Sequence, residues 1–122
     1  MKMEAGMQEF DMDQVRQLVA GPKFYEDQSE RTCPACGNSA VRTYVYRSHI
    51  RARPTLISYM WCANCRRFKG WTGPDLGTFD FTDPLENLSS EQRAAMAKDF
   101  GGFFQNLDRL WNSGELPQRF SR

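Results

Sequence analysis

Four cysteines in two pairs constrain the fold of this 122-residue chain more than any other feature. Cys33 and Cys36 form one C-x2-C pair, and Cys62 and Cys65 form a second pair after 25 intervening residues. Two thiolates at this spacing can hold one cation from a tight turn, and two such turns complete a tetrahedral shell of sulfur. The spacing predicts one Zn²⁺ bound by all four cysteines, with iron in the same shell and two disulfides as alternatives.

A shell closed by four thiolates leaves no coordination position for water, which argues against catalysis at the metal. We therefore expect a structural ion, one per chain, whose binding contributes to folding. His49 is the only histidine, and we interpret it as a solvated loop residue between the two cysteine pairs. With the thiols committed and the histidine remote, no Ser/His/Asp or Cys/His catalytic arrangement can be built. We expect no enzymatic activity.

The segment between the cysteine pairs has the composition of a long β-hairpin. Residues 41–47 and 55–61 are rich in β-branched and aromatic side chains, which favours strands, and residues 48–54 form the connecting loop. Residues 67–72 predict a third strand, ended by Gly73 and Pro74. The hairpin would return the second cysteine pair to the first. The predicted sheet is antiparallel and three-stranded.

Two helices are predicted outside this sheet. Asp11 with Gln14 forms a capping-box pattern before a short N-terminal helix, and Ser89 with Gln92 forms another before the C-terminal helix. Apolar residues then recur with helical spacing at Met96, Phe100, Phe103, Phe104, Leu107, Leu110 and Trp111. This stripe keeps its phase across residues 101–102, a glycine pair. It predicts one long helix in which the glycines mark a kink or a close backbone approach.

The cysteine pattern, the hairpin and the closing strand together resemble the zinc-ribbon superfamily over about residues 31–72. The resemblance implies that Cys33, Cys36, Cys62 and Cys65 are the ligands and that Gly37 is the glycine of the first turn, or knuckle. Arg66 departs from the pattern, because many ribbons have a second glycine there. Residues 33–37, 58–67 and 110–120 also resemble parts of small, mostly uncharacterised bacterial zinc-ribbon proteins, some of which look like immunity partners in toxin loci.

The net charge of +1 conceals a strong asymmetry along the chain. Residues 31–74 carry eight basic side chains and no carboxylate, whereas residues 1–30 and 75–122 carry net charges of −4 and −3. Basic side chains among aromatic ones suit a nucleic-acid surface. The candidates for phosphate contacts are Arg42, Arg47, Arg51, Arg53, Arg66, Arg67 and Lys69. The alternative is that the aromatic rings pack against the C-terminal helix and the arginines pair with the acidic arms.

We expect a single α+β domain over residues 1–122: an N-terminal helical arm (1–30), a zinc ribbon (31–74), and an acidic loop followed by the C-terminal helix (75–122). The leading functional hypothesis is a non-enzymatic zinc protein that recognises another protein. The alternative is a nucleic-acid-binding ribbon. No apolar run reaches the length needed to span a bilayer, and the first residues lack the apolar segment of a signal peptide, so we expect a cytoplasmic location.

Overall fold

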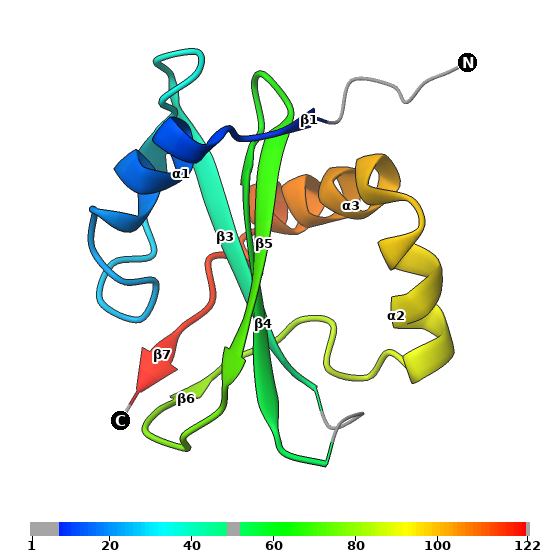
Figure 1. The fold of residues 1–122 in the computed structure, drawn as a ribbon. Helices are drawn as coiled ribbons and strands as arrows, with labels where there is room; N and C mark the ends of the chain where they lie inside the picture. The colour runs from blue at the N-terminus through cyan, green and yellow to red at the C-terminus, as the bar shows by residue number, and fades with distance from the viewer. Residues whose placement is uncertain (1–7, 49–51, 122) are drawn as a thin grey trace.

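The computed structural model describes residues 8–48 and 52–121, which fold into a central β-sheet with helices on both faces (Figure 1). Helix α1 covers one face of the sheet, and α2 and α3 lie on the other. The elements in chain order are β1 (Gln8–Glu9), α1 (Met12–Val19), β2 (Arg31–Thr32), β3 (Ser39–Ser48), β4 (Thr55–Cys62), β5 (Arg67–Pro74), β6 (Asp80–Phe81), α2 (Ser90–Ala97), α3 (Phe100–Ser113) and β7 (Phe120–Ser121). The chain is therefore α+β, as predicted.

The main sheet has five strands in the order β1-β5-β4-β3-β2, whereas the sequence predicted three. The three long strands are the predicted ones, and they pair antiparallel, with Val41 opposite Cys62 and Trp61 opposite Phe68. Strand β1 pairs parallel with β5, and β2 pairs antiparallel with β3. These two edge strands have two residues each, too few to show the period-two alternation by which strands are detected in a sequence.

The predicted long C-terminal helix is two helices. The chain leaves α2 at Lys98, and Asp99 then caps α3 by accepting a hydrogen bond from the backbone N–H of Gly102 at 3.1 Å. A Cβ at Gly102 would lie 2.5 Å from the Asp99 carboxylate, so the glycine makes room for the cap. The helix therefore breaks before the glycine pair, at a new N-cap. The predicted capping boxes at Asp11 and Ser89 are confirmed.

The core on the α3 face of the sheet is aromatic. Tyr44 and Trp61 are fully buried there against Phe103, Phe104 and Leu107 of α3. The Trp61 and Phe104 rings stack with centroids 5.4 Å apart. Burying each large apolar side chain contributes about 1.5–3 kcal/mol. The predicted apolar stripe thus packs on the sheet despite the break between the two helices.

A second, smaller core lies on the opposite face, where α1 packs over the end of the sheet that carries the cysteines. Leu18 of α1 and Phe10 join Val41 and Met60 of the sheet in this cluster, together with the side chains of Cys33 and Cys62. The first cysteine of each pair is therefore part of the packed interior. No helix in the described part of the chain is long and apolar enough to cross a membrane.

The C-terminal segment returns to the edge of β3 through Gln118. Its side-chain oxygen accepts a hydrogen bond from the N–H of Val45 at 2.9 Å, and its amide nitrogen donates to the carbonyls of Val45 and Thr82 at 2.7 and 2.8 Å. Gln118 is 3 % exposed. It satisfies backbone groups of β3 beyond the short strand β2, which keeps this edge from pairing with another chain.

Candidate metal centre

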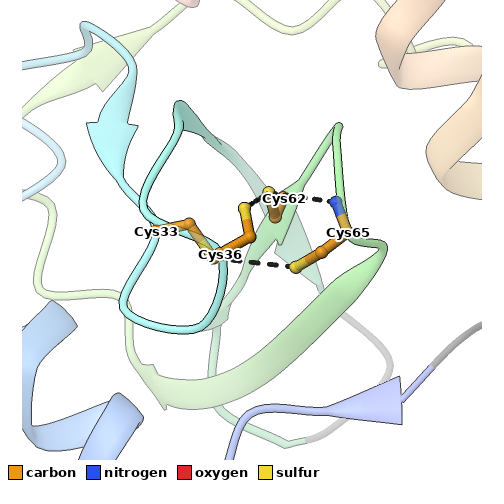
Figure 2. Close-up of side chains that lie close together, drawn as sticks. All are labelled: Cys33, Cys36, Cys62 and Cys65. Atoms are coloured by element: carbon orange, nitrogen blue, oxygen red, sulfur yellow. Dashed lines mark hydrogen bonds between the residues drawn. The ribbon is translucent and has the colours of Figure 1, made fainter.

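The four cysteines lie together at one end of the main sheet (Figure 2). Cys33 and Cys36 belong to the turn between β2 and β3, Cys62 ends β4, and Cys65 lies in the turn before β5. The antiparallel pairing of β3 with β4 brings the two turns side by side, as the sequence predicted. All four Sγ atoms lie within 4.8 Å of one another. The Cys33–Cys65 and Cys36–Cys62 Sγ atoms are both 3.7 Å apart.

These spacings fit a metal ion held by sulfur alone. A tetrahedral Zn²⁺ with Zn–S bonds of about 2.3 Å separates its sulfur ligands by about 3.8 Å. The Cys33–Cys65 and Cys36–Cys62 pairs match this edge length. A tetrahedral iron ion takes the same four thiolates. The cluster is thus compatible with structural metal binding, and the donor set favours a soft or borderline cation over Mg²⁺ or Ca²⁺.

The two cysteine turns have the same backbone geometry, although only one contains a glycine. Gly37 and Arg66 each follow the second cysteine of their pair, and their φ angles are +81° and +68°. Their N–H groups donate to the carbonyls of Cys33 and Cys62 at 2.9 and 3.0 Å. A left-handed conformation costs a non-glycine residue about 1–2 kcal/mol. Arg66, which stands where many ribbons have a glycine, therefore leaves the geometry of the turn intact. The strain of its left-handed backbone costs free energy that other contacts must offset.

Those contacts come from helix α3. The Arg66 guanidinium donates from Nη1 to Asp108 Oδ2 at 3.1 Å and from Nη2 to the carbonyl of Gly101 at 3.3 Å. A glycine could make neither bond. Arg66 therefore links the second cysteine turn to helix α3.

Hydrogen bonds and burial shift the pKa values of Cys36, Cys62 and Cys65 in different directions. The backbone N–H of Asn38 and the side-chain amide of Asn64 lower the pKa of Cys36 to about 6. Burial raises the pKa of Cys62 to about 12 and also raises that of Cys65. Backbone N–H groups donate to Cys33 Sγ and Cys62 Sγ at 3.4 Å. A bound cation would supply the charge that allows the buried thiols to ionise.

Asp108 joins the cysteine end of the sheet to α3, and it was not among the residues that the sequence indicated. Its Oδ1 accepts from Arg42 Nη1 and from the indole N–H of Trp61, both at 2.8 Å. Its Oδ2 accepts from Arg66. Asp108 is the only carboxylate in α3, and it lies beside the apolar stripe. A single carboxylate at such a position was the sequence feature that could have identified it.

The acidic arms fold back onto the basic segment. Among the seven candidate phosphate-binding residues, four form ion pairs with carboxylates outside residues 31–74. These pairs are Arg42 with Glu30 and Asp108, Arg47 with Asp75 and Asp80, Arg66 with Asp108, and Lys69 with Glu9. Within the described residues, Arg53 and Arg67 have no carboxylate oxygen within 4 Å. Arg51 and His49 lie outside the described residues.

Aromatic rings also cover two of these arginines. The Arg42 guanidinium lies 5.0 Å from the centre of the Trp111 ring, and that of Arg47 lies 4.6 Å from the Phe81 ring. Both cations therefore contact an intramolecular π face as well as carboxylates. Two aromatic residues of the sheet, Tyr44 and Trp61, are buried against α3, so their rings are not accessible for stacking on bases.

Comparisons with known proteins identify no relative of this chain. No protein-family model, curated protein or solved structure matches it. The resemblance to zinc ribbons therefore depends on the cysteine motifs and the hairpin between them.

Proposed function

We propose that the chain binds one structural Zn²⁺ through Cys33, Cys36, Cys62 and Cys65 and acts as a non-enzymatic module that recognises another protein. The observation that carries the metal assignment is the convergence of four Sγ atoms within 4.8 Å. Two C-x2-C turns on a hairpin are the usual protein frame for such an ion.

A structural role follows from the position of the cluster. Four thiolates would fill the tetrahedral shell and leave no position for substrate or water. Cys33 and Cys62 are at most 1 % exposed and belong to the core beneath α1. An ion at this point would join the turn after β2 to the turn after β4. We expect its loss to loosen the α1 core and, through Arg66, the attachment of α3.

The charge pattern supports a protein partner over a nucleic acid. Binding to phosphates draws its free energy from cations that release counterions, and cations already paired with carboxylates contribute little. Arg42, Arg47, Arg66 and Lys69 are paired in this way. The nucleic-acid alternative then depends on Arg53 and Arg67 within the described residues. A partner of the toxin type has support only from the resemblance to bacterial zinc-ribbon proteins.

Cobalt substitution tests the metal assignment. Apo-protein titrated with Co²⁺ should reach saturation at one equivalent, with the intense charge-transfer and d–d absorption of a tetrahedral thiolate site, and Zn²⁺ should displace the cobalt. Cys36→Ser should weaken or abolish this spectrum, whereas Lys98→Ala, a change at the exposed C-cap of α2, should leave it unchanged. An octahedral cobalt spectrum, or no binding, would exclude the site.

A salt titration separates the two partner classes. The protein-interaction hypothesis predicts a saturable complex with one purified protein and only weak, non-selective affinity for DNA or RNA. The alternative predicts that the logarithm of the nucleic-acid affinity falls linearly with the logarithm of salt concentration. In that case an Arg53→Ala, Arg67→Ala double variant should lower the slope by about two units. A flat response removes the nucleic-acid alternative.

A further inference from the structure

A hollow of about 230 Å³ opens on the face of the sheet that α1 covers, away from α3. Its floor is formed by side chains of the three long strands, among them Thr43, Met60 and Trp71. Leu18 of α1 and Phe24 of the following connector form its walls. The hollow is separate from the cysteine cluster, whose four residues are absent from its lining.

Two cations line this apolar hollow, and neither has a carboxylate oxygen within 4 Å among the described residues. They are Lys23 and Arg31. The half-buried Arg31 guanidinium donates from Nη2 to the carbonyl of Asp27 at 3.3 Å. The Asp27 carboxylate itself accepts from the N–H and the hydroxyl of Ser29 at 2.9 and 2.6 Å. Burial lowers the pKa of Arg31, and the attraction of Asp27 opposes this only in part. A permanently charged guanidinium thus lies in an apolar wall, and it can donate further hydrogen bonds.

A second hollow, of about 520 Å³, lies beside the first. The two share Phe24, Ser58 and Trp71, and the second is also lined by Leu56 and Phe79. A ligand held at the cationic end could therefore extend an apolar group along the sheet. A third hollow, of about 610 Å³, differs because its cations already have carboxylate partners. Its two arginines, Arg47 and Arg93, are already bonded to Asp75 and Asp83.

We propose that this hollow binds a small organic carboxylate with a flat apolar body. The carboxylate accepts hydrogen bonds from Arg31, with Lys23 adding charge at the rim, and the body packs against Met60 and Trp71. Guanidinium–carboxylate pairing is strong and directional. An apolar trough with a few convergent polar groups is the usual form of a small-molecule site. A ligand of this kind would supply a carboxylate partner to Arg31, whose acceptor within the described residues is the backbone carbonyl of Asp27.

The probe is 2-naphthoate, with 2-naphthamide as the neutral analogue of the same shape. Titration calorimetry on the metal-loaded protein should detect naphthoate binding, and the amide should bind at least tenfold more weakly. Arg31→Ala should also lower the naphthoate affinity at least tenfold. Lys23→Ala should lower it a few-fold, and Lys98→Ala, on the other side of the sheet, should leave it unchanged. Naphthoate binding should also change the tryptophan fluorescence, and Trp71→Phe should remove most of that change while calorimetry still detects binding.

Circular dichroism and metal content establish that each variant is folded. Equal affinity for naphthoate and naphthamide would overturn the proposal, because the cations would then play no part. No binding of naphthoate by the folded wild type would overturn it as well. Unchanged affinity in a folded Arg31→Ala protein would do the same, and if that variant does not fold, the amide and Lys23→Ala still decide the outcome.

Discussion

Replacing Asp108 with alanine should strongly destabilise the fold. The substitution removes the acceptor of three hydrogen bonds: two guanidinium bonds, from Arg42 and Arg66, and one from the buried Trp61 indole. The Asp108 side chain is 19 % exposed, and those of Arg42 and Arg66 are 13 % and 28 % exposed. Solvent therefore screens these bonds only in part.

The size of the effect depends on which hydrogen-bond acceptors each donor keeps when Asp108 is removed. A hydrogen bond to a charged group contributes about 1.5–3 kcal/mol, and a buried donor without an acceptor costs about 1–3 kcal/mol. Arg42 keeps its bond to Glu30, and Arg66 keeps its bond to the carbonyl of Gly101. The free-energy cost of each lost guanidinium bond should therefore lie near the low end of the first range. Trp61 is fully buried and retains no acceptor among the described residues. We expect the free energy of unfolding to fall by about 3–5 kcal/mol.

Urea unfolding of the zinc-loaded protein, followed by circular dichroism, measures this change. Asp108→Asn should lose about half as much, since the amide oxygen can still accept from Trp61 while the charge is gone. Asp13→Ala removes a surface ion pair with Arg16, whose side chains are 83 % and 71 % exposed, and should cost less than about 1 kcal/mol. A loss below about 1 kcal/mol for Asp108→Ala would refute the assignment of Asp108 as the link between the sheet and α3.

Three further predictions concern backbone geometry and ionisation. In urea unfolding, Arg66→Ala should be more destabilising than Arg66→Gly by about 1 kcal/mol, because both lose the guanidinium bonds but only glycine relieves the left-handed strain; the opposite order would contradict the strain argument. Gly102→Ala should lower the free energy of unfolding by about 1 kcal/mol, because the added Cβ displaces the Asp99 cap, and an unchanged value would show that the cap contributes nothing. Burial raises the pKa of Tyr59 to about 12 and also raises that of Tyr44. Unfolded tyrosine loses its proton near pH 10, so above that pH the unfolded state binds fewer protons and stability should fall as the pH rises from about 10 to 12. Urea midpoints that stay constant over this range would contradict the burial of these hydroxyls.

The features that could be predicted from the sequence are those with a local cause. The C-x2-C spacing indicates a thiolate cluster because both partners of each pair lie in one turn. The long strands and the caps at Asp11 and Ser89 follow from alternation and from side chains within three residues of the backbone they bind. The clustering of all four cysteines needed one more step, the return of the hairpin, which the strand composition indicated correctly.

The features that sequence reasoning missed depend on contacts between distant segments or on competing local signals. Met96 and Phe100 stay in helical phase across the break, so periodicity could not detect that α2 and α3 are separate. The cap at Asp99 was the local signal that the apolar stripe concealed. Strands β1 and β2 exist because longer strands offer them an edge. The role of Asp108 requires α3, β3, β4 and the second cysteine turn to be in place at once.

Native mass spectrometry, with elemental analysis of protein purified without added metal, tests the central claim most directly. The account predicts one zinc ion per chain and no titratable thiol until the protein is unfolded or chelated, because all four sulfurs are ligands. Cys36→Ser should lose most of the metal. A folded protein with less than about half an equivalent of zinc or iron, and with four thiols that react freely, would contradict the metal centre and the fold argument that depends on it.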